Sequence, residues 1–173
     1  MLGPGDLIFH PKHGFGTISG LTRRDPLHPI QDVVAGERVS DQAQAYYDIQ
    51  LMDGGTLLVP VNRAERVGLR LLTNGVDAIT LCLHSPAQSL PEDARKRAAE
   101  LWARGQMGEP IALAASVRDM LAQSRGRALT ASEKTWLDKS CECLSREAAL
   151  VDRISRSQAH AAIWETVTQL SAP

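Results

Sequence analysis

The feature that most constrains the fold of this chain is a change of hydrophobic period near residue 70. Before that point apolar and polar residues alternate, as in Tyr47-Asp48-Ile49-Gln50-Leu51, and alternation is typical of a half-buried strand. After it, apolar residues recur at steps of four and three, the pattern of an amphipathic helix. The longest such series is Leu137, Cys141, Leu144, Ala148 and Val151. The sequence therefore predicts an α+β protein, with a β domain over residues 1–70 and an all-α domain over residues 71–173.

Short strands and tight turns predict that the first domain is a small barrel of the SH3 or Tudor type. The strands are expected over residues 7–9, 15–21, 47–51 and 56–61. Asp53-Gly54-Gly55 supplies a hairpin turn, because glycine tolerates a positive φ. Residues 25–44 contain prolines and many polar groups and are expected to form a long loop. Four or five such strands would close on themselves.

The second domain is predicted to be a bundle of about five helices. Ser89-Leu90-Pro91-Glu92 and Thr130-Ala131-Ser132-Glu133 both have the spacing of a capping box, which marks the start of a helix. Further helices are expected near residues 75–84, around residues 113–121 and from Ser157 toward Leu170. Each helix is short enough to depend on packing against the others.

Composition limits how the chain could act on nucleic acid and where it resides. Its net charge is -1, and non-specific affinity for nucleic acid comes mainly from neutralised phosphates. Any DNA contact must therefore be local or assisted by a second partner. No apolar run approaches the roughly 18 to 20 residues that span a bilayer, and the first residues lack the pattern of a signal peptide. We expect a cytoplasmic protein without a membrane partner.

Metal binding and catalysis are not expected. Cys82, Cys141 and Cys143 lack the spacing of a zinc site and fit reduced thiols. His10 and His13 flank a turn without an acidic or thiol partner, so a surface turn is favoured over a metal site. The sequence also contains no nucleophile elbow, phosphate-binding glycine loop or metalloprotease motif. We therefore expect no enzyme, cofactor or metal.

Several motifs resemble those of one known family. Residues 5–16, Gly-Asp-Leu-Ile-Phe-His-Pro-Lys-His-Gly-Phe-Gly, resemble the opening signature of CarD-like transcription regulators. The same module occurs as the polymerase-interacting domain of the transcription-repair coupling factor. The strings that continue the resemblance are residues 46–49, 58–70, 90–93, 117–120 and 129–134. Because both domains match, the stand-alone regulators are more similar than the coupling factor, whose motor domains this chain lacks.

The resemblance implies a partner for the β domain. In the family, an exposed strand edge of this domain pairs with the β subunit of RNA polymerase. Arg24 falls where the family commonly has a polymerase-contacting arginine, and Leu58 falls at a second contact position. The candidate polymerase-binding residues are Arg23, Arg24, Leu57, Leu58 and Val59. The alternatives are that Leu58 packs in the core and that the two arginines are an ordinary solvated pair. We expect the protein to be a monomer when bound.

The resemblance also implies that the helical domain reaches promoter DNA at the upstream edge of the transcription bubble. There the family usually has a tryptophan wedge, and this chain has Ala94, whose methyl group cannot fill an unstacked base step. A basic family position falls on Ala99, and Trp102 is expected in the bundle core. The candidate DNA-binding residues are Ala94, Arg95, Lys96, Arg97 and Arg104, which would contact phosphates without reading sequence. The alternative is a polymerase-binding module without wedge activity.

Overall fold

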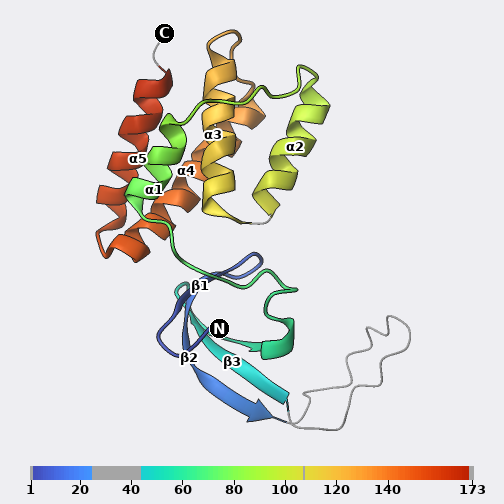
Figure 1. The fold of residues 1–173 in the computed structure, drawn as a ribbon, viewed down its shortest axis with the longest axis vertical. Coiled ribbons are helices and arrows are strands. Elements are labelled where there is room, and N and C mark those ends of the chain that lie inside the picture. Colours follow the sequence, from blue (N-terminus) through green and yellow to red (C-terminus); the bar gives the residue numbers. More distant parts are fainter. Residues whose placement is uncertain (1, 25–43, 107, 172–173) are drawn as a thin grey trace, which may run out of the picture. The chain divides into compact units, whose positions relative to one another are not determined.

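The computed structural model of this chain describes residues 2–24, 44–106 and 108–171. The chain divides into two compact units, Met1–Leu71 and Leu72–Pro173, and each is described by itself. The described residues of the first unit form strands and one short 3₁₀ turn, and those of the second form helices (Figure 1). The expected α+β class, with the β unit first, is confirmed.

The first unit, called the β unit below, is a five-stranded antiparallel sheet. The strands are β1 (Leu7–His10), β2 (Gly14–Arg24), β3 (Gln44–Leu51), β4 (Thr56–Pro60) and β5 (Arg70–Leu71), with the 3₁₀ turn η1 (Val61–Arg63) after β4. Their order in the sheet is β4-β3-β2-β1-β5. The expectation that the strands close on themselves is wrong for the described residues: β4 and β5 stand at opposite ends of an open sheet. Strand β5 has two residues and pairs with β1 alone.

The geometry of the sheet explains why two positions of the opening signature are glycines. Gly14 begins β2 with φ of +78°, a conformation that other residues rarely adopt. Gly16 lies where β2 passes close to β3. A Cβ there would be 2.8 Å from Cγ2 of Ile49 and 2.9 Å from the carbonyl oxygen of Gln50. The signature is therefore in part a requirement of the sheet itself.

Inward-facing side chains of the sheet form the core of the β unit. The buried residues are Ile8, Ile18, Tyr47, Ile49, Val59, Ala64 and Leu69. His10 is also buried, and its Nδ1 accepts the backbone N–H of Lys12 at 3.1 Å. This histidine thus stabilises the turn between β1 and β2, but it does so from a buried position rather than from the surface that the sequence favoured. Of the expected loop, residues 25–43 lie outside the described part of the chain, and Gln44 is the first residue of β3.

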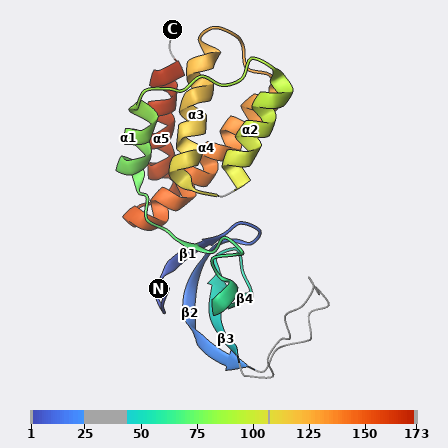
Figure 2. The ribbon, with the colours of Figure 1, turned by 45° about the vertical axis from the view of Figure 1, so that its right-hand side comes forward.

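The described part of the second unit, called the helical unit below, contains five α-helices. They are α1 (Val76–His84), α2 (Ala94–Gln106), α3 (Pro110–Ser124), α4 (Ala131–Asp152) and α5 (Arg156–Ser171). Helices α1, α3, α4 and α5 pack together, and α2 lies along one side next to α3 (Figures 1 and 2). The centre of this core is apolar and fully enclosed, with Ile79, Val117, Met120, Leu144 and Ile163 each 2% exposed or less.

The starts of two helices test the expected capping boxes. The box at Thr130 is confirmed, because its hydroxyl accepts the N–H of Glu133 while the Glu133 carboxylate accepts the N–H of Thr130. The box at Ser89 is wrong. Helix α2 begins at Ala94, and Oδ1 of Asp93 accepts the N–H groups of Arg95 and Lys96. The helix starts later than expected for two reasons. Asp93 caps it instead of Ser89, and the buried Arg97 takes the carbonyl groups of Pro91 and Glu92, as described below.

Candidate functional site

Strand β4 presents a free edge. It pairs with β3 alone, and no other described strand lies beyond it. The N–H of Leu51 donates to the carbonyl of Gly55, and hydrogen-bonded pairs alternate along an antiparallel ladder. The backbone groups of Leu57 and Val59 therefore point to β3, whereas those of Thr56 and Leu58 point outward. Pro60, which has no N–H, falls at an outward position, as this register requires.

Alternation along β4 also separates its side chains. Leu57 packs against the core of the β unit and Val59 is buried within it. Leu58 pairs with Asp48 and lies on the outer face of the sheet, half-buried and outside the core cluster. The structure therefore does not support the alternative that Leu58 packs in the core. At this position both an apolar side chain and free backbone groups are accessible.

The two arginines that end β2 lie on opposite faces of the sheet. Both are exposed. Arg24 pairs with Gln44 and Arg23 with Ala45, so Arg24 shares its face with Leu58 and Arg23 does not. The carboxylate of Asp48, on the same face, accepts the hydroxyl of Thr22 at 2.5 Å. Arg24 and Leu58 thus lie on the same side of the sheet, and this side, together with the free edge of β4, is called the β4 face below.

Helix α2 is attached to the other helices largely through ion pairs between side chains. Leu101 is its one fully buried apolar residue, and Arg97 beside it is only 3% exposed. Nε of Arg97 donates to Oε1 of Glu133 at 2.7 Å, and Nη1 donates to the carbonyl groups of Pro91 and Glu92 at 2.8 Å. Arg97 is therefore a packing residue in this structure, and we leave it out of the DNA surface proposed below.

Glu133 is the centre of this first ion cluster. Its carboxylate also accepts two hydrogen bonds from Arg127, at 2.6 and 2.9 Å, and the N–H of Thr130 at 2.8 Å. The guanidinium of Arg127 is the main cause that holds the pKa of Glu133 well below its usual range, followed by Thr130 and Arg97, while burial opposes it. The cluster ties the start of α2 to the start of α4.

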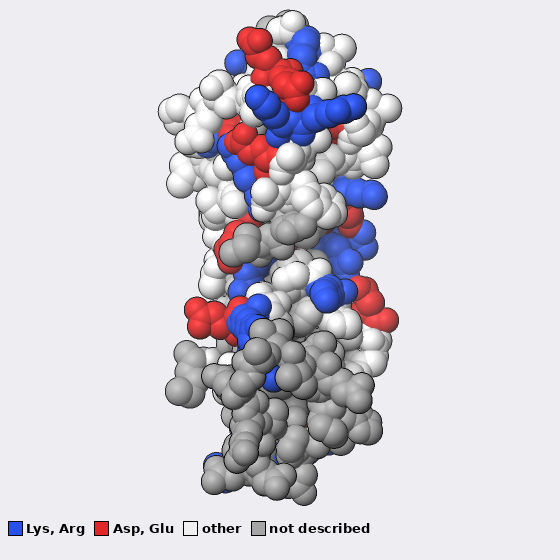
Figure 3. All heavy atoms as spheres, turned by 90° about the vertical axis from the view of Figure 1, so that its right-hand side faces the viewer, with Lys and Arg blue, Asp and Glu red and all other residues white. Residues whose placement is uncertain are grey.

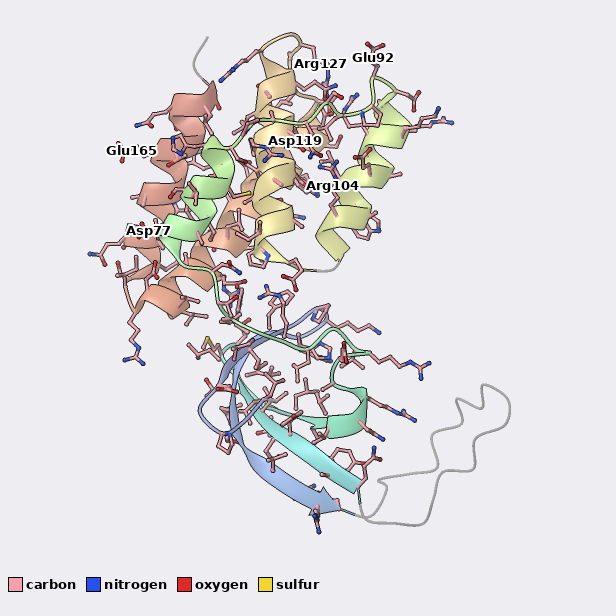
Figure 4. All side chains as sticks on the ribbon, viewed as in Figure 1. Asp77, Glu92, Arg104, Asp119, Arg127 and Glu165 are labelled. Carbon is pink, nitrogen blue, oxygen red and sulfur yellow. The ribbon has the colours of Figure 1, made fainter. Side chains whose placement is uncertain are left out.

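Asp119 is the centre of a second cluster, nearer the end of α2. Its side chain is fully buried and accepts Nη1 of Arg104 at 2.9 Å, the guanidinium of Arg118 at 2.7 and 2.8 Å, and the N–H of Gln88 at 2.8 Å. Arg104 points toward Asp119 from α2 (Figure 4) and also bonds Glu100. Arg104 therefore anchors α2 to α3 rather than projecting toward solvent.

The remaining candidates on α2 are on its outer surface. Ala94, Arg95 and Lys96 are exposed, and no described residue forms an ion pair with either cation. On the side of the molecule that Figure 3 shows, basic and acidic groups gather at the upper end of the helical unit, above a largely uncharged area. Charged groups of both signs are therefore mixed at this end of the helical unit.

Trp102 is not where the sequence placed it. The expectation that it packs in the core is wrong, because 65% of its surface is exposed. Residues 97, 101 and 104 of α2 face the bundle, with Arg97 and Leu101 buried and Arg104 partly exposed, and residue 102 points away from them. The other two tryptophans differ: Trp136 packs against the bundle core, and Trp164 stacks on His160 with ring centroids 5.7 Å apart.

A metal site or a reactive thiol among the described residues would indicate chemistry. No group of three histidines, cysteines or carboxylates among them could hold a metal ion. Burial raises the pKa of Cys141 to about 12, so its thiol is not a ready nucleophile. None of the helices in this part of the chain could span a lipid bilayer.

Comparisons with known proteins cover both units. The family model of the CarD-like/TRCF RID domain matches residues 2–72, and that of the CarD C-terminal domain matches residues 78–164. The chain belongs to the CarD-like family. This CarD-like chain is also similar to "Putative transcription factor YdeB" of Bacillus subtilis (strain 168), with 26% identity over 161 residues, 89% of this chain and 94% of that protein. The family is of a transcription-factor type rather than an enzymatic one.

The motifs that carried the resemblance in the helical half turn out to hold the ion clusters. Asp119 lies in the string 117–120, and Glu133 lies in the string 129–134. Sequence reasoning identified the strings but missed that their carboxylates receive Arg97 and Arg104. The signal that could have found this is the spacing of four and three that places Arg97, Leu101 and Arg104 on one face of α2.

Proposed function

We propose that this CarD-like protein binds the β subunit of RNA polymerase through the β4 face and brings α2 to promoter DNA, where it modulates the stability of the open complex. The observation that carries the proposal is the free edge of β4 with Leu58 at its centre. A free edge offers unpaired N–H and C=O groups that add to the sheet of a partner. The protein acts as a monomer in this proposal.

Three contributions to polymerase binding are expected from the β4 face. The outward backbone groups of Thr56 and Leu58 extend the partner sheet, and the side chain of Leu58 fills an apolar pocket beside it. Arg24, on the same face, pairs with an acidic group of the partner. Leu57 and Val59 support this edge from the core side. Arg23 lies on the opposite face and contributes less.

Binding of RNA polymerase to variants of the full-length chain tests this proposal. Leu58→Glu places a charge at the centre of the edge, and we expect at least a tenfold loss of affinity, about 1.4 kcal/mol or more. Leu71→Glu is the matched control, because Leu71 is an exposed leucine on the opposite edge strand. The same comparison between Arg24→Glu and Arg23→Glu should separate the two faces. Equal affinities of Leu58→Glu and Leu71→Glu would refute docking through β4.

For DNA, we propose contacts to phosphates from Arg95 and Lys96, next to Ala94. These contacts are not sequence-specific, because phosphates carry no base identity. A rival role is a polymerase-binding module that leaves DNA untouched. The burial of Arg97 and the attachment of Arg104 to Asp119 favour this rival, because they reduce the cations available for phosphates. A change in the upstream footprint of polymerase distinguishes the two roles.

A further inference from the structure

Trp102 exposes more of its surface than an ordinary packing tryptophan. Tryptophan is highly buried on average, yet 65% of Trp102 is accessible and it is absent from the bundle core. It stands on α2, the helix that the two ion clusters hold in place. A large aromatic side chain that is held outward on an anchored helix is suited to contact a partner.

The surroundings of Trp102 form a narrow ridge on α2. Arg95, Ala99 and Trp102 follow one another at steps of four and three, so they share the outer face of the helix. The flanking residues Ala98 and Ala103 are exposed as well. The ridge, defined as Arg95, Ala99 and Trp102, extends about 10 Å along the helix axis.

The charge beside this ridge is positive. Arg95 and Lys96 are exposed and have no ion pair with a described residue. Of the nearby carboxylates, Asp93 caps α2 through its Oδ1 and Glu100 bonds Arg104, whereas Glu92 is exposed just before the helix begins. A polyanion fits this arrangement. The alanines supply too little apolar area for this ridge to bind in a groove of a partner protein, because affinity between proteins usually depends on a cluster of large anchor residues.

We infer that Trp102 stacks on an unpaired base at the edge of opened DNA while Arg95 and Lys96 contact the adjacent phosphates. Aromatic side chains next to cations are the usual means of holding single-stranded nucleic acid, because every base has a face to stack on. The inference rests on the proposed function and assigns its aromatic contact to a place about 12 Å along α2 from Ala94. The contact needs no wedge at residue 94.

The indole signals of the full-length chain test this inference directly. The ¹⁵N-labelled protein is titrated at low salt with two synthetic DNAs, a duplex with a short unpaired stretch at one end and a fully paired duplex of equal length. Trp102→Phe and Trp164→Phe assign two of the three indole signals. We expect the Trp102 signal to move strongly with the forked DNA and weakly with the duplex, while the Trp136 and Trp164 signals stay in place. NMR registers weak complexes, so polymerase is not needed.

Affinity measurements with variants complete the test. Trp102→Ala should lose about tenfold in affinity for the forked DNA, and Trp102→Phe should retain most of it, because phenylalanine also stacks. Trp164→Ala is the matched control and should bind as the unaltered chain does. An unmoved Trp102 signal, or equal affinities of Trp102→Ala and Trp164→Ala, would overturn the inference. So would a loss of polymerase binding in Trp102→Ala, since the ridge would then contact protein. Docking through β4 is judged separately by Leu58→Glu.

Discussion

Gly16 lies on β2 where this strand passes close to β3, and single atoms decide what the position tolerates. The nearest contacts of an added Cβ would be Ile49 at 2.8 Å and the backbone of Gln50 at 2.9 Å. A buried side chain and a backbone carbonyl cannot move aside as a flexible surface side chain would. The same strand offers a contrast at Gly20, where a Cβ would meet nothing within 4 Å.

Gly16→Ala is therefore expected to lower the free energy of unfolding of the β unit by about 2 kcal/mol, the usual cost of an overpacked site. Gly20→Ala should change it by less than about 0.5 kcal/mol. Chemical denaturation of both full-length variants, followed by near-ultraviolet circular dichroism, checks the prediction. Equal stability of the two variants would show that the sheet yields at Gly16 and that the close approach is not a constraint.

At the scale of elements, α2 differs from the other helices in how it is held. The clusters around Glu133 and Asp119 tie its two ends to α4 and α3. Partly buried ions that lose a partner are costly, because the remaining charge is left without compensation. The position of α2, and with it the proposed DNA surface, therefore depends on these ion pairs.

Acid should weaken the attachment of α2. The pKa of Glu133 is lowered in the folded chain from its ordinary value of 4.5, mainly by Arg127. Its contribution to stability is thus complete above that ordinary value and is lost as the pH falls toward the folded pKa. Glu133→Gln keeps a capping-box residue but removes the charge. We expect it to cost about 2 kcal/mol at neutral pH and to reduce the acid dependence of unfolding.

The matched control is Glu92→Gln, an exposed carboxylate near the start of α2. Urea unfolding of the two variants between pH 3 and pH 7 provides the measurement, and amide hydrogen exchange in α2 reports on its attachment. If Glu133→Gln unfolded with the pH profile of Glu92→Gln, the cluster would not hold α2.

The sequence predicted these elements well where the interacting residues are close together in the chain, and poorly where they are far apart. The box at Thr130 was predictable because both partners lie within four residues. The one at Ser89 was not, because Arg97 takes the carbonyl groups of Pro91 and Glu92. Arg97 itself looked like a surface cation, since its partner Glu133 is 36 residues away.

Predictions from hydrophobicity also failed for Trp102 and for strand β5. Trp102 was expected in the core because large aromatic residues usually bury themselves, but the face of α2 that packs inward is set by Arg97, Leu101 and Arg104. Strand β5, with two residues, was too short to be recognised from a pattern. The edge position of β4, in contrast, agrees with the placement of Pro60 at a strand end.

At the scale of the whole molecule, two units with separate cores are joined in one chain. Because the net charge is -1, the chain alone should bind DNA weakly at physiological salt. Binding of the β unit to polymerase would raise the local concentration of α2 near the promoter, as any tethered second contact does. In this account polymerase binding comes first and the DNA contact depends on it.

The most direct measurement is the footprint of RNA polymerase on a promoter with and without this protein. Docking through β4 with α2 at the DNA predicts added protection or a longer-lived footprint at the upstream edge of the bubble, abolished by Leu58→Glu and retained with Leu71→Glu. If polymerase bound the protein through β4 and the upstream footprint were unchanged in extent and lifetime, the helical unit would not act on DNA and the account would be contradicted.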